Sequence, residues 1–221
     1  MEGVIAQTLR LRFTSRETCW ASRGSLVSLD SGITWSLKVP GGAAGALKRG
    51  FAGEGFALNF IQATRPGAEV VLSANQPGKV IVWDLERDGT ILATRGAFLA
   101  AVGDVDISAT VARRAGAALF GGAGLFLQKM SGEGLVFLHL AGDFIDRMLG
   151  ADEILQVSTG NLAAFSDRAD YRIRGVGGCR KALFSGEGLF MTELQGPGRV
   201  LIQSLKRQRG GSSGRGRHPS A

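Results

Sequence analysis

The sequence predicts an all-β protein built from three similar, glycine-rich units. Three observations lead to this fold class: apolar and polar residues alternate along several stretches, glycine is unusually abundant, and two glycine-marked segments recur along the chain. A period of two places successive side chains on opposite faces of a strand, which is the pattern of a half-buried antiparallel sheet.

The alternation is clearest in residues 5–13, 33–39 and 105–111. In the second of these stretches, polar residues separate four apolar ones, which are Ile33, Trp35, Leu37 and Val39. We expect each stretch to form a strand whose apolar face turns toward a core. Helix formers without alternation occur only in residues 43–49 and 112–120, so little helix is expected, in the form of short turns.

Glycine accounts for 34 of the 221 residues, about twice its usual share of about 7%. The glycines fall between the alternating runs and have no collagen-like period. Tight turns and bulges, where glycine's conformational freedom is needed, therefore explain the excess.

Two glycine markers reveal an internal repeat. One tetrapeptide occurs in three variants, separated by 69 and 64 residues: Gly53-Glu54-Gly55-Phe56, Gly122-Ala123-Gly124-Leu125 and Gly186-Glu187-Gly188-Leu189. A second marker begins at Gly24, Gly96 and Gly160, with separations of 72 and 64 residues. Two markers that recur with nearly the same spacing indicate three repeated units.

The repeats set the expected domain organisation. They cover about residues 1–72, 73–140 and 141–205, and each is too small to bury an apolar face alone. We expect them to pack on one another as a single domain over residues 1–205, in a pseudo-threefold arrangement of sandwich-like or barrel-like units. A hairpin is also expected in each unit, with turns at Pro66-Gly67, Gly132-Glu133-Gly134 and Gly196-Pro197-Gly198.

Positive charge is concentrated at the end of the chain. The net charge is +7, and five of these charges lie in residues 206–221, a Gly/Ser/Arg-rich tail that we expect to be disordered. The remaining +2 argues against nucleic-acid binding by the folded part. Weak nucleic-acid binding through the tail is one hypothesis, and an inert, solvated tail is the favoured alternative.

Cysteine usage and hydropathy bear on location. Cys19 and Cys179 are far apart and have no zinc-like spacing, so reduced, buried thiols are expected. The sequence shows neither a signal-peptide pattern nor the run of about 20 apolar residues that spans a bilayer. We therefore expect a cytoplasmic protein without a transmembrane segment.

Residues for catalysis or metal binding are scarce. The two histidines, His139 in an apolar stretch and His218 in the tail, cannot form a triad or a metal site together. His139 is expected in the core or at its rim. Three pairs of aspartates, Asp104 with Asp106, Asp143 with Asp146, and Asp167 with Asp170, could serve acid–base chemistry or bind a cation, but we expect them to cap turns. The sequence thus predicts no enzyme, no cofactor and no metal.

One charged feature recurs in all three units. A pair of basic residues stands a few positions before each glycine tetrapeptide: Lys48 and Arg49, Arg113 and Arg114, and Arg180 and Lys181. Our hypothesis is that they form a basic ring for an anionic partner such as lipid headgroups, nucleic acid or an acidic protein. The alternative, which we favour on the sequence alone, is three solvated turns.

Several segments together carry a resemblance to a known family. They are Gly41-Gly42 with Leu47-Lys48-Arg49, residues 53–59, Arg95 to Ala100, Gly124 to Leu127, Ser131 to Gly134, Phe184 to Leu189 and Gly196 to Val200. In combination, and over about residues 5–205, they resemble the AIM24 (DUF124) family, whose fold is described as like that of the tryptophan RNA-binding attenuation protein. The sequence departs from the family pattern at Asn161, where relatives often have His, and at Arg23, where an acidic or small residue is common.

The resemblance implies a double-stranded β-helix type of fold, three units per chain, and a homo-oligomer of three or more copies. It implies no catalytic residues, and the eukaryotic members look like organisation factors of the mitochondrial inner membrane. We therefore expect a non-enzymatic, oligomeric β scaffold or adaptor that presents a repeated surface to a protein or membrane-surface partner. The alternative is a binding module for a small ligand or RNA.

Overall fold

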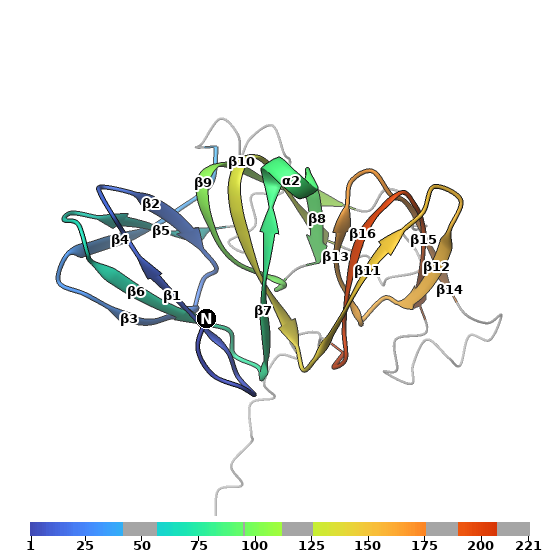
Figure 1. Ribbon diagram of the computed structural model, residues 1–221, viewed down its shortest axis with the longest axis horizontal. Helices are drawn as coiled ribbons and strands as arrows, with labels where there is room; N and C mark the ends of the chain where they lie inside the picture. Colours follow the sequence, from blue (N-terminus) through green and yellow to red (C-terminus); the bar gives the residue numbers. More distant parts are fainter. Residues whose placement is uncertain (42–56, 95, 112–125, 176–189, 207–221) are drawn as a thin grey trace, which may run out of the picture.

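The computed structural model describes residues 1–41, 57–94, 96–111, 126–175 and 190–206 (Figure 1). These residues form antiparallel strands and one four-residue helix, so the all-β prediction is confirmed. Three groups of strands follow one another along the longest axis, in chain order (Figure 1).

We call these groups the first, second and third units. The first unit contains β1 (Thr8–Arg12), β2 (Thr18–Ala21), β3 (Leu26–Leu29), β4 (Ile33–Lys38), β5 (Leu58–Ala63) and β6 (Glu69–Ser73). The second contains β7 (Gly78–Asp84), α2 (Leu85–Asp88), β8 (Ile91–Thr94), β9 (Phe98–Val111) and β10 (Phe126–Ala141). The third contains β11 (Phe144–Leu149), β12 (Ile154–Ser158), β13 (Leu162–Ser166), β14 (Asp170–Gly175), β15 (Phe190–Gln195) and β16 (Gly198–Gln203).

The same strand pairing recurs in each unit. In the first unit, β6 lies between β1 and β3, and β5 lies between β2 and β4. In the third, β16 lies between β11 and β13, and β15 between β12 and β14. In the second, the long β9 and β10 each serve both layers: the first part of β10 pairs with β8 and its second part with β7. These pairings are compatible with the three repeats expected from the sequence.

Neighbouring units share sheets. β2 of the first unit pairs with β9 of the second, and β8 of the second pairs with β13 of the third. At each boundary, a three-stranded layer of one unit therefore joins a three-stranded layer of the next in a single continuous sheet. At the two ends of the molecule, β1-β6-β3 and β12-β15-β14 remain three-stranded.

The expected hairpins are absent, because the strands on either side of each glycine turn do not pair with each other. β5 and β6 belong to different layers, as do β15 and β16. In the second unit, Gly132-Glu133-Gly134 is not a turn but a bend inside the continuous β10. Gly132 and Gly134 have φ of +107° and +140°, and a Cβ there would lie 2.2 and 2.3 Å from backbone oxygens of β9. Only glycine fits where two strands bend together this closely.

Each unit has its own apolar core between its two layers. Ile61 and Leu72 are fully buried in the first, Ile107 and Leu138 in the second, and Phe165 in the third. Trp20 and Leu58 of the first unit also pack against the core of the second, and Leu92 and Leu127 of the second belong to that of the third. The units therefore stabilise one another through shared cores as well as shared sheets.

One expectation about burial is wrong. Ile33 of β4 is buried, but Trp35 and Leu37, which share its face, are each 50% exposed. β4 is the last strand of its sheet among the described residues, so its outer part has no neighbour to cover it. Alternation correctly predicted the strand but not how far the core extends.

The short helix α2 was not foreseen. Asp84 is its N-cap, because its carboxylate accepts hydrogen bonds from the backbone N–H groups of Glu86 and Arg87. The helix ends at Asp88, and the carbonyl oxygen of its C-cap residue, Gly89, accepts a hydrogen bond of 2.8 Å from the indole N–H of the buried Trp83.

Candidate binding surface

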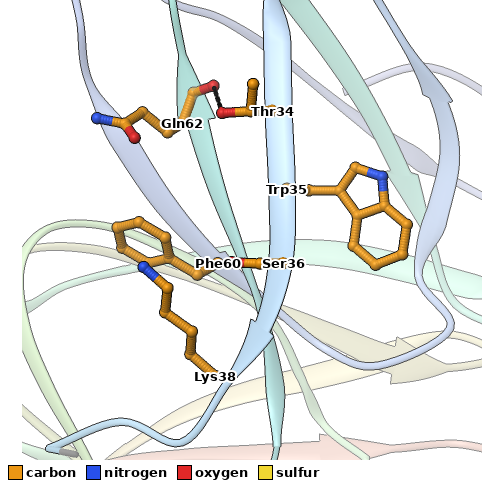
Figure 2. A pocket seen from close by; sticks show the side chains of 6 residues that line it. All are labelled: Thr34, Trp35, Ser36, Lys38, Phe60 and Gln62. Carbon is orange, nitrogen blue, oxygen red and sulfur yellow. Dashed lines mark hydrogen bonds between the residues drawn. The ribbon is translucent and has the colours of Figure 1, made fainter.

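The outward face of the β4–β5 pair holds a shallow, open pocket. Ser36 lies opposite Phe60 and Thr34 opposite Gln62 in the strand register, so these four side chains share one face. Together with Lys38 and Trp35 they line a pocket of about 190 Å³. Figure 2 shows Trp35 on the other side of β4 from Phe60 and Lys38.

The hollow combines an aromatic ring, a cation and neutral hydrogen-bonding groups. The Lys38 ammonium lies 3.9 Å from the centroid of the Phe60 ring, a cation–π contact (Figure 2). Trp20 lies opposite Phe60 in the β2–β5 register and contacts this ring edge-on, with a centroid distance of 4.9 Å. The Thr34 hydroxyl donates to the carbonyl oxygen of Gln62 at 3.3 Å (Figure 2). Such a surface can hold an anionic or planar group against the ring.

The equivalent outward faces of the other two units are polar and have no aromatic ring at this place. In the second unit, the position of Ser36 and Phe60 is taken by Ser108 and Lys129, which lie opposite each other. In the third it is taken by Arg172 and Glu193. Glu193 accepts a hydrogen bond of 2.9 Å from Arg174, and Lys129 forms an ion pair of 3.4 Å with Asp167. The three faces thus share their architecture but not their chemistry.

The predicted basic pairs cannot be placed. Lys48, Arg49, Arg113, Arg114, Arg180 and Lys181 all lie outside the described residues. In the sequence, each pair falls between the two paired strands of one outward face: between β4 and β5, β9 and β10, or β14 and β15. The flanking strands are equivalent in the three units, so the hypothesis of a repeated basic surface stays a prediction.

The acid pairs found in the sequence do not form a catalytic constellation. Asp104 and Asp106 lie within β9 rather than in a turn, where they were expected. Asp146 on β11 is held by Arg199, with its Oδ2 2.8 Å from Nη2. Asp167 pairs with Lys129, and Asp143 accepts a hydrogen bond from the backbone N–H of Phe144. The structure gives three of these acids plain structural partners.

The histidine and cysteine that the structure describes are both core residues. His139 on β10 is 1% exposed, which confirms the expectation of a core position. Cys19 on β2 is also 1% exposed, and burial raises the pKa of its thiol to about 12. The expected reduced, buried thiol is confirmed for Cys19, whereas Cys179 lies outside the described residues.

The described residues hold neither a metal-binding cluster nor a membrane-spanning helix. None of their His, Cys, Asp and Glu side chains form a group of three or more that could hold a metal ion. None of their helices is long and apolar enough to cross a membrane.

A family model described as "Mitochondrial biogenesis AIM24" matches residues 2–205 of the 221. The chain belongs to the AIM24 family. This confirms the resemblance seen in the sequence. Among curated proteins, none matches this AIM24 chain.

The AIM24 chain is also similar to a protein of Streptococcus pyogenes whose crystal structure was determined in a structural genomics programme. The two chains are 21% identical, the alignment covers 93% of this chain and 92% of the other, and the TM-score is 0.75. At this identity the likeness establishes the fold, which the two proteins share over nearly their full lengths.

Sequence reasoning missed the hollow of this AIM24 chain. It had placed Thr34, Ser36 and Lys38 on the polar face of one strand, but it had no means to pair them with Phe60 and Gln62, more than twenty residues away. The signal that could have pointed there is Phe60, an aromatic residue at a position filled by charged residues in the other two repeats.

Proposed function

We propose that this AIM24 protein is a non-enzymatic, oligomeric β scaffold or adaptor that presents a repeated surface to a protein or to the surface of a membrane from the cytoplasm. The observation that carries the proposal is the recurrence of one strand arrangement in three units, each with a polar face turned outward. Each strand position on the outward face of one unit therefore has a counterpart in the other two, although the side chains at these positions differ.

Repetition favours binding to an extended partner over chemistry at one centre. Linked weak contacts act together, because the second and third engagements are intramolecular once the first has formed. Oligomerisation multiplies this effect. A reaction would require a convergent set of acid, base and nucleophile, whereas Asp146 and Asp167 are engaged in ion pairs and His139 is in the core.

The six basic residues that fall, in the sequence, between the strands of the outward faces are the proposed contact with an anionic partner. A test is to replace Lys48, Arg49, Arg113, Arg114, Arg180 and Lys181 with Glu and to measure sedimentation with vesicles containing 30% phosphatidylserine. We expect binding to fall at least tenfold and to weaken with salt in the parent protein. A matched control replaces six exposed arginines and lysines of the strands, among them Arg12 and Arg172. Unchanged binding by the first variant would remove the basic ring from the proposal.

A second candidate function, a binding module for a small ligand or RNA, is favoured by the hollow on the first unit. Phe60 can stack against a planar group while Lys38 neutralises an anion. The test is titration of single-stranded RNA oligonucleotides and of aromatic anions against Phe60→Ala and the parent, with truncation after Leu205 to separate any contribution of the tail. A ligand that binds the parent and the truncated chain, but not Phe60→Ala, supports this second function.

A further inference from the structure

The two ends of the molecule are complementary halves of the junction that joins its units. At the first boundary, Cys19, Trp20 and Ala21 of β2 lie opposite Val102, Ala101 and Ala100 of β9. At the second boundary, Ile91, Leu92 and Ala93 of β8 lie opposite Ser166, Phe165 and Ala164 of β13.

The two junctions use the same positions of the repeat. A step of 72 residues leads from Cys19 to Ile91, and a step of 64 leads from Val102 to Ser166. These are the separations of the markers at Gly24, Gly96 and Gly160. Each residue pair of the first junction therefore has its counterpart in the second. The two junctions use equivalent strands of the repeat, paired in the same register.

The repeat also says which residues would form a third junction. Moving 64 residues on from β8 leads to Leu155, Gln156 and Val157 of β12. Moving 72 residues back from β9 leads to Asp30, Leu29 and Ser28 at the end of β3. Among the described strands, β12 pairs only with β15 and β3 only with β6, so each has one open edge.

The open edge of β3 is exposed in the first unit, whereas the equivalent strand edges of the second and third units are covered. Val27 is 60% exposed, whereas its equivalents Leu99 and Ala163 are 1% and 0% exposed. Leu29 is half-buried and Ser28 exposed, whereas the residues at their positions in the other two units are fully or almost fully buried: Ala100, Ala101, Ala164 and Phe165. An open strand edge beside an exposed apolar side chain is a template for another strand.

A side-chain hydrogen bond repeats across the junctions as well. The hydroxyl of Ser22 donates to the carbonyl oxygen of Phe98, and the hydroxyl of Thr94 donates to that of Leu162 at 3.1 Å. The third residue in this series is Ser158, which ends β12, and the matching carbonyl belongs to Leu26. The third unit thus keeps the hydroxyl group that the other two use.

We propose that β12 of one copy pairs with the open edge of β3 of a second copy, antiparallel, with Leu155, Gln156 and Val157 opposite Asp30, Leu29 and Ser28. This inference rests on the oligomer of the proposed function and names the surface that forms it. The occupant is a second copy of the chain because, among the described strands, only β12 has the register, the hydroxyl and the matching half-sheet. The contact joins two different surfaces head to tail, so repeated use gives a ring where the rotation between copies closes and an open filament where it does not.

The first experiment disrupts the proposed contact at β3 without changing a residue that is buried in a unit's own core. Val27→Lys leaves an exposed side chain in a single copy but places a charge where Leu99 and Ala163 are buried. Ile145→Lys on β11 is the matched control, because Ile145 is also 60% exposed and β11 pairs with β16 in a different sheet from β3 and β12. By native mass spectrometry and light scattering, we expect the oligomeric fraction to fall at least tenfold in Val27→Lys and to stay unchanged in Ile145→Lys.

The second experiment tests the register. Gln156→Cys and Leu29→Cys chains, both with Cys179→Ser, are mixed and oxidised. Directly opposite residues on neighbouring strands are close enough for a disulfide, whereas a shift of one residue turns the side chain to the other face. We expect a covalent dimer from the mixture, little from either chain alone, and little when Ser28→Cys replaces Leu29→Cys.

The outcomes separate this inference from the proposed function. An oligomer that persists in Val27→Lys, or cross-links equally well through Ser28→Cys, overturns the edge pairing and leaves the oligomer standing. A parent protein that is monomeric at concentrations up to about 100 μM overturns both. A dimer formed by Leu29→Cys chains alone would show a symmetric β3 contact instead and would also overturn the head-to-tail junction.

Discussion

Arg199 and Asp88 tie the third unit to the second: Nη1 of Arg199 donates a hydrogen bond of 2.7 Å to Oδ2 of Asp88. Their side chains are only 14% and 13% exposed. The same guanidinium holds Asp146 of β11 and lies 4.9 Å from the ring of Trp83. Arg199 thus joins β16 of the third unit to α2 of the second and stabilises the contact between these two units.

Arg199→Ala should destabilise the fold more than other arginine substitutions. It leaves Asp88 and Asp146 close together without their shared cation and removes the contact with Trp83. Charged hydrogen bonds of this kind contribute about 2 kcal/mol, so we expect a loss of that size in urea unfolding. Arg172→Ala, at an exposed site on β14, is the control and should change stability by less than about 0.5 kcal/mol. Equal effects of the two variants would contradict the assigned role.

The contribution of Asp88 should disappear in acid. Hydrogen bonds from Arg87 hold the pKa of Asp88 below its ordinary value of 3.8, and the charge of Arg199 lowers it further. A carboxyl whose pKa is lower in the folded state adds stability above its unfolded pKa and loses it as the pH falls through the folded value. The stability difference between the parent and Asp88→Asn should therefore be constant from pH 7 to about pH 5 and shrink below about pH 4. Urea titrations at pH 7, 5, 3 and 2 measure it, and a difference that stays constant to pH 2 would rule the explanation out.

Gly78→Ala should be strongly destabilising because of close backbone packing. A Cβ at Gly78 would lie 2.0 Å from the carbonyl oxygen of Leu140 and 2.6 Å from Nε2 of His139, so the first residue of β7 would have to leave β10. We expect a loss of about 3 kcal/mol in the free energy of unfolding. Gly150→Ala is the matched control, since its Cβ would have no neighbour within 4 Å. A small effect at Gly78 would mean that the two strands separate easily.

Local pattern and long-range pairing differed in how well the sequence predicted them. Alternation correctly predicted β4 and the second part of β9, because it is a local signal. The glycine spacing predicted three repeats, and the observed strand pairings are compatible with them. The same glycines were misread as hairpin turns. Whether a glycine turns the chain back on itself or sends it into the other layer depends on partners far along the chain, such as β1 for β6.

The candidate binding surface could also be predicted from the sequence only in part. The polar face of β4 was visible in the sequence, but its extension by Phe60 needs the register between β4 and β5. The exposure of Trp35 was missed because alternation assumes a covered apolar face, and cover at the end of a sheet is a tertiary property. The open edges of β3 and β12 became visible only when the pairings of the other units were known.

Cys19 should resist modification until the protein unfolds. Its side chain is 1% exposed, and burial raises the pKa of the thiol to about 12, so little thiolate exists at pH 8. In a Cys179→Ser background, we expect Cys19 to react with Ellman's reagent on the order of 100-fold more slowly in the native protein than in urea, where the thiol regains an ordinary pKa of about 8.5.

A control separates burial of the thiol from a general lack of reactivity. Ala151→Cys, introduced at an exposed turn into a chain that carries Cys19→Ser and Cys179→Ser, should react at nearly the same rate in both states. Cys19 pairs within the sheet that joins the first two units, opposite Val102, so its labelling rate also reports how often that junction opens. Arg199→Ala acts at the other junction and should leave this rate nearly unchanged, whereas rapid native labelling of Cys19 in the parent would show that the first junction is not closed.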